Sequence, residues 1–77
     1  MNYQIDEASD LMKVIRHKGT QAFFAAGGWT ADFEAAEKFS DTLSVLKAQQ
    51  EYSLKNVEVV LVMGDKPSPY DVVLHLD

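Results

Sequence analysis

The chain contains no cysteine, which excludes disulfides and thiolate metal sites. It has no apolar run close to the roughly 20 residues that a membrane-spanning helix needs. Residues 1–7 show no basic segment followed by an apolar one, so we expect no signal peptide. These absences predict a protein of a reducing compartment, the cytoplasm, without a membrane partner.

Basic residues are also few. Seven Lys and Arg stand against twelve Asp and Glu, which gives a formal net charge of −5. Nucleic acids and anionic membranes attract basic surfaces, so this balance argues against direct binding to either. The expected partner is a protein or a second copy of this chain, and the negative charge favours solubility or a basic partner.

What is present is an ordinary globular composition, with 47% hydrophobic and 25% charged residues in a chain of 77. A chain this short buries only about 60% of its unfolded surface, so every large apolar side chain matters. Residues 1–77 are therefore predicted to form one small α+β domain.

The run 56–63 is rich in β-branched residues and is followed by Gly64, which predicts a strand. Both of its faces are largely apolar. Alternation places Val57, Val59, Leu61 and Met63 on one face and Glu58, Val60 and Val62 on the other. Two apolar faces indicate a central strand that is covered on both sides.

A second strand is predicted at residues 21–25, a short apolar run that ends at Gly27-Gly28. The adjacent Phe23 and Phe24 point to opposite faces of such a strand. This strand therefore also needs cover on both sides.

A third strand is predicted at residues 70–76, where apolar and polar side chains alternate. A loop at 64–69 precedes it and contains Pro67 and Pro69. We expect this strand to return antiparallel to 56–63.

Residues 6–18 are predicted to form a helix. Apolar residues recur at the helical period, namely at Ile5, Ala8, Leu11, Met12 and Ile15. Acidic residues come early, basic residues come late and Gly19 follows, which suits the helix dipole and a C-cap. The competing interpretation is a strand from Leu11 to His17 that turns through Lys18-Gly19. The caps favour the helix.

Two more helical segments are expected. One runs from about Ala31 to Lys38 with Thr30 or Asp32 as its cap, and one covers 43–52 with its N-cap in Ser40-Asp41-Thr42. The stripe of the second that we expect to face the core is lined by Phe39, Leu43, Leu46 and Gln50 and flanked by Val45 and Tyr52. The assembled prediction is an α-β-α-β-β chain with a small three-stranded mixed sheet and helices packed on it. The alternative is β-β-α-β-β.

The motif Gly28-Trp29-Thr30-Ala31-Asp32, followed by Ala36 and Phe39, resembles a pattern in many small bacterial and phage proteins of unknown function. In that pattern an extended segment ends in G-W-T-x-D and leads to a short helix, A-x-x-F, an acid-capped helix and a strand. The resemblance covers roughly residues 20–63. It implies no activity, and it implies that the Trp and Phe are core and corner residues.

The leading functional hypothesis concerns the sheet face that carries Val60 and Val62. If both helices cover the Val57 face, Val60, Val62 and Val73 form an exposed apolar strip on the other. We therefore predict a non-enzymatic interaction module that docks a protein, or forms a homodimer, on this strip.

Two further residues are candidate contacts. Trp29 follows two glycines and suits an interface anchor, against the alternative that it closes one end of the core. His75 lies on the less apolar face of the last strand and is the best candidate for a pH-sensitive or metal contact.

The alternative function is an acidic inhibitor, or nucleic-acid mimic, of a basic nucleic-acid-binding protein from a mobile element. Its acidic surface would be Asp32, Glu34, Glu37, Asp41 and Glu51. We predict no enzyme, no cofactor and no metal, because no nucleophile elbow, phosphate loop or ligand spacing of His stands out.

Overall fold

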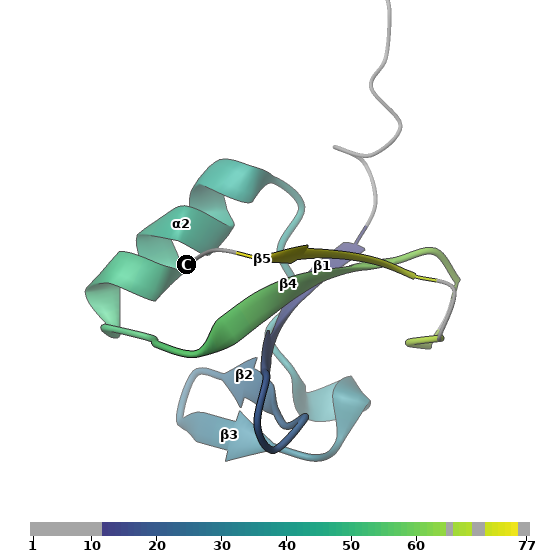
Figure 1. Cartoon of the computed structure of the whole chain (residues 1–77), viewed down its shortest axis with the longest axis horizontal. Helices are drawn as coiled ribbons and strands as arrows, with labels where there is room; N and C mark the ends of the chain where they lie inside the picture. The colour runs from purple at the N-terminus through teal and green to yellow at the C-terminus, as the bar shows by residue number, and fades with distance from the viewer. Residues whose placement is uncertain (1–11, 65, 69–70, 76–77) are drawn as a thin grey trace, which may run out of the picture.

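The computed structural model describes residues 12–64, 66–68 and 71–75, which form an α+β fold (Figure 1). The elements in chain order are β1 (Met12–His17), β2 (Phe23–Ala25), β3 (Gly28–Thr30), the 3₁₀ turn η1 (Phe33–Ala35), α2 (Thr42–Glu51), β4 (Val57–Val62) and β5 (Val72–His75). The strands form one five-stranded sheet in the order β3-β2-β1-β4-β5. Each strand is antiparallel to its neighbours.

The predicted helix over 6–18 is wrong where the structure describes it, because residues 12–17 form β1. Six residues of β1 pair with β4, from Met12 opposite Val62 to His17 opposite Val57. Val14 and Ile15 are both fully buried on opposite faces of the sheet, which a helix with one apolar stripe cannot achieve. The part of the predicted helix before residue 12 lies outside the described residues.

The turn after β1 is longer than the predicted Lys18-Gly19 pair. The backbone N–H of His17 donates to the carbonyl of Ala22 at 2.8 Å, and that of Gln21 donates to His17 at 2.8 Å. Gln21 takes a left-handed φ of 65° to close this turn.

The predicted three-stranded mixed sheet is also wrong, for two reasons. β1 inserts between β2 and β4 and is antiparallel to both, so no parallel pair of neighbours arises. The chain does not leave the sheet at Gly27-Gly28. It reverses there and forms a β2–β3 hairpin, in which Phe24 pairs with Trp29 and Ala25 with Gly28. Gly28 has a φ of 142°, which residues with a Cβ rarely adopt.

The first helical segment is shorter than predicted, and the second buries a different set of side chains from the one predicted. Only the single turn η1 forms within 31–38, and the carboxylate of Asp32 caps it by accepting from the N–H of Glu34 at 3.0 Å. α2 begins after the N-cap Asp41, as predicted, but it buries Val45 and Ala48 rather than the expected stripe. Leu43 and Leu46 are 63% and 39% exposed.

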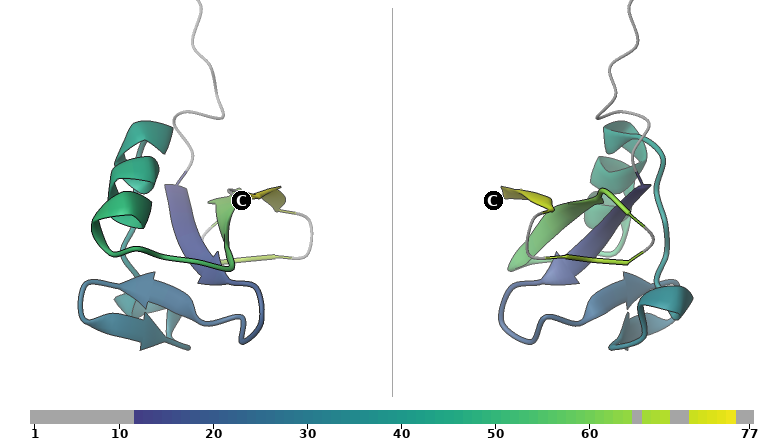
Figure 2. Two further views of the ribbon diagram at one scale, coloured as in Figure 1. Left: turned by 60° about the vertical axis from the view of Figure 1, so that its left-hand side comes forward. Right: turned by 90° about the vertical axis from the view of Figure 1, so that its right-hand side faces the viewer.

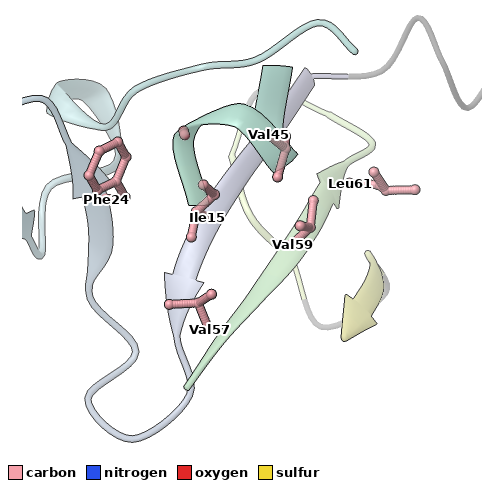
Figure 3. Packing of buried hydrophobic residues seen from close by; sticks show 7 residues of the cluster. Ile15, Phe24, Val45, Val57, Val59 and Leu61 are labelled. Atoms are coloured by element: carbon pink, nitrogen blue, oxygen red, sulfur yellow. The ribbon is translucent and has the colours of Figure 1, made fainter. Parts of the chain in front are cut away.

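Two hydrophobic clusters lie on the two faces of the sheet. The first joins α2 to β1, β2 and β4, and α2 lies on one side of these strands (Figure 2). Figure 3 shows Val45 of α2 beside Ile15 and Val59, with Phe24 at one end of the cluster and Leu61 at the other. Its buried members are Ile15, Phe24, Val45, Ala48, Val57, Val59 and Leu61.

The second cluster lies on the opposite face and is covered partly by the η1 segment. Its buried members are Val14, Phe23, Ala36, Val60 and Val62. Phe33 of η1 meets Phe23 edge-on, with ring centroids 5.7 Å apart. Phe23 and Phe24 therefore do point to opposite faces, and the chain itself packs side chains against both.

Candidate functional site

The structure places the predicted contact residues in different environments. Val60 and Val62 are 1% and 2% exposed, and Val73 packs against the same second cluster. The expected exposed strip therefore does not exist on the single chain. His75 pairs with Glu58 in the β4–β5 register.

Trp29, another predicted contact residue, is accessible to solvent at 43% exposure. It pairs with Phe24, so both rings lie on the α2 side of the sheet, with centroids 6.0 Å apart. Its other neighbour is His17, at 5.4 Å and nearly perpendicular. Trp29 thus packs on the end of the core with one part of its ring and offers the rest to solvent.

His17 is held by the turn that follows it. Its Nδ1 accepts hydrogen bonds from the backbone N–H groups of Gly19 at 3.1 Å and Thr20 at 3.2 Å. These two hydrogen bonds hold the imidazole in one orientation beside Trp29.

A pocket of about 220 Å³ lies beside these rings, between α2 and residues 37–39. Its lining is Phe24, Glu37, Phe39, Ser44, Lys47, Ala48, Glu51 and Tyr52. Phe24 is 4% exposed and Ala48 8%, so both form the floor. The Tyr52 ring, 48% exposed, lies 5.0 Å from that of Phe24 and continues the aromatic surface towards Trp29.

Backbone hydrogen bonds fix the wall formed by residues 37–39. The N–H of Glu37 donates to the carbonyl of Phe24 at 2.9 Å. Phe39 and Lys13 exchange two hydrogen bonds of 2.8 and 2.9 Å, which makes an isolated antiparallel bridge to β1. This wall therefore extends the sheet and is rigidly placed opposite α2.

The start of α2 is fixed by its cap. Asp41 accepts from the N–H of Ser44 at 2.7 Å. This backbone hydrogen bond, a side-chain one from Ser44 and the positive charges of Lys13 and Lys47 lower the pKa of Asp41 below its ordinary value of 3.8. Lys13 itself is 2% exposed, and its Nζ donates to the carbonyl of Ser40 at 3.2 Å.

The rim of the pocket is charged. Glu37, Lys47 and Glu51 are exposed, and none of them forms an ion pair with another residue in the described part of the chain. Two carboxylates therefore face one ammonium around an aromatic floor.

Sequence patterns did not indicate this pocket. Phe39 and Tyr52 were assigned to the core side of a helix, and Glu37 and Glu51 to a general acidic surface. The pocket arises because Glu37, Phe39 and residues of α2, which are close in sequence, line it together with Phe24 of the distant strand β2. No periodicity in the sequence encodes that placement.

Residues 12–64, 66–68 and 71–75 contain no group of three or more His, Asp or Glu placed to hold a metal ion. Within the same ranges, no helix has the length and apolar character to cross a membrane. Comparison of the chain with protein-family models, curated proteins and solved structures gives no match.

Proposed function

We propose that this chain is a small acidic protein-interaction module that binds a protein partner through an aromatic groove. The groove consists of Trp29, Phe24, Tyr52 and the adjoining pocket. The observation that supports it is the continuous series of ring contacts from the half-exposed Trp29 through Phe24 to the half-exposed Tyr52. Trp and Tyr are enriched among interface residues that dominate binding energy, because they bury a large apolar area with few rotors.

The rigidity of the groove favours binding further. Phe24 is fixed in the core, and the wall at 37–39 is hydrogen-bonded to β1 and β2. A preformed surface loses little conformational entropy when it binds.

A second candidate function is inhibition of a basic nucleic-acid-binding protein. Glu37 and Glu51 beside the pocket favour it, because they make the groove attractive to a basic partner. Asp32 and Asp41 support it less, since their carboxylates serve as helix caps.

The test compares partner capture by three forms of the whole chain, each checked for its fold by circular dichroism. Immobilised wild-type chain is expected to retain a protein that the Trp29→Ala/Tyr52→Ala variant loses. The matched control is Leu43→Ala, because Leu43 is a 63% exposed apolar residue of α2 that does not line the pocket. Identical protein sets on all three forms would refute the groove as the binding surface.

A further inference from the structure

We propose that the pocket beside Tyr52 receives an arginine side chain from the protein partner. This inference rests on the proposed function and specifies the chemistry of the partner. Three features of the pocket support it, namely its size, its aromatic floor and its charged rim.

The volume sets the size of the occupant. At about 220 Å³ the pocket exceeds the roughly 150 Å³ of a cavity that holds benzene. It is smaller than the roughly 300–1,000 Å³ of pockets that hold drug-sized ligands. One long side chain fits this range, whereas a nucleotide-sized cofactor does not.

The floor and wall favour a flat, weakly hydrated group. Phe24, Phe39 and Tyr52 supply aromatic surface, and Ala48 leaves room because its side chain is small. A guanidinium stacks on such rings through its planar face, and its positive charge is attracted to the ring quadrupole.

The rim favours a cation. Glu37 stands on one wall and Glu51 on the other, and neither is paired with a described basic residue. Among the described residues that line the pocket, Lys47 is the one basic residue, against the two carboxylates. The net charge of the chain, −5, adds to the attraction.

Arginine fits this combination better than lysine. The five N–H donors of a guanidinium can reach carboxylates on two sides while its face remains stacked on a ring. An ammonium is a compact, strongly hydrated charge, and it would lose more hydration on entering an aromatic pocket.

The experiment titrates the isotope-labelled full chain with acetyl-arginine amide and follows backbone amide shifts by NMR. We expect saturable shifts at Glu37, Ala48 and Glu51 with a dissociation constant on the order of millimolar. Acetyl-citrulline amide has nearly the same shape without the charge, and we expect it to bind at least about tenfold more weakly. Acetyl-lysine amide, with its free ε-ammonium, is expected to lie between the two.

The matched variants separate charge from shape. Glu37→Gln/Glu51→Gln is expected to weaken arginine-amide binding by about tenfold or more, whereas Glu34→Gln, an exposed carboxylate of η1 outside the pocket, leaves it unchanged. Equal binding of citrulline, equal binding by the Gln/Gln variant, or no saturable shift would overturn the arginine assignment.

The two proposals fail in different ways. Capture of a protein that needs Trp29 and Tyr52 but tolerates Glu37→Gln/Glu51→Gln would leave the interaction function standing and refute the arginine anchor. Binding of arginine amide without any Trp29- and Tyr52-dependent capture would refute the interaction function, and with it the assignment to a partner's side chain.

Discussion

Arg16 and Glu58 face each other across the β1–β4 register and form a largely buried ion pair. Arg16 Nε donates to Glu58 Oε2 at 2.7 Å, and Nη2 lies 2.6 Å from the same oxygen. The two side chains are 21% and 9% exposed. The pair is thus the charged margin of the second hydrophobic cluster, beside the apolar residues of β4.

Arg16→Met is expected to lower the free energy of unfolding by about 2 kcal/mol, because it removes a positively charged partner of the mostly buried Glu58 carboxylate. Arg16→Met combined with Glu58→Leu should recover most of this loss, since an apolar pair of similar volume has no charge to desolvate. Urea unfolding at constant m measures both variants. A single variant as stable as wild type, or a double variant worse than the single one, would contradict this account.

The two sheet faces should be equally sensitive to cavities. Val59 and Val60 point to opposite faces of the sheet, and both are almost completely buried. Val59→Ala and Val60→Ala are therefore each expected to lower the free energy of unfolding by about 2 kcal/mol. Val72→Ala, at a residue that is 47% exposed, is the control and should change stability by less than about 0.5 kcal/mol. If only Val59→Ala destabilised the protein, the second face would not be packed as described.

The end of α2 offers a stabilising substitution. Ser53 has a φ of 53°, and the N–H of Leu54 donates to the carbonyl of Gln49 at 2.9 Å, which is the pattern of a Schellman C-cap. Ser53→Gly should raise the free energy of unfolding by about 0.5–1 kcal/mol, because glycine adopts this conformation without steric cost. Gln50→Gly inside the helix is the control and should lower it by about 1 kcal/mol. Both are measured by thermal unfolding, and equal signs would refute the cap.

Asp41 should make part of the stability depend on pH. Its pKa is lowered in the folded state by the Ser44 hydrogen bonds, so its contribution is fully present above its ordinary pKa of 3.8 in the unfolded chain. That contribution is lost as the pH falls through the lower, folded pKa. Asp41→Asn retains a capping oxygen without a titrating charge, and its melting temperature should therefore fall less between pH 5 and pH 2 than that of wild type. The control, Asp41→Ala, should lose helix signal in circular dichroism at every pH in this interval.

Strand propensity located much of the sheet. Residues 56–63 and 70–76 were predicted as strands that run antiparallel, and β4 and β5 form within those ranges. The opposite orientations of Phe23 and Phe24 follow from strand geometry alone. Asp41 was also found within the predicted capping segment, because a capping side chain acts on backbone groups two or three residues away.

Sequence patterns did not predict the aromatic groove. For Trp29 the sequence left two alternatives open, an interface contact or a core residue. Its ring packs against Phe24 on one side, and the residue is 43% exposed. Tyr52 and Phe39 gave no separate signal, since their meaning depends on which stripe of α2 faces the sheet.

The sequence by itself determined an acidic α+β chain without cysteine, with a strand at 56–63 that is apolar on both faces and a capped helix over 43–52. These are local properties, decided by side-chain alternation, propensity and hydrogen bonds between near neighbours. Only the tertiary structure decided that Met12–His17 is a strand, because pairing with β4 buries Val14 and Ile15 on both faces at once. Burial on two faces is a property of the assembled sheet, and it outweighed the helical spacing and the charge order of the isolated segment.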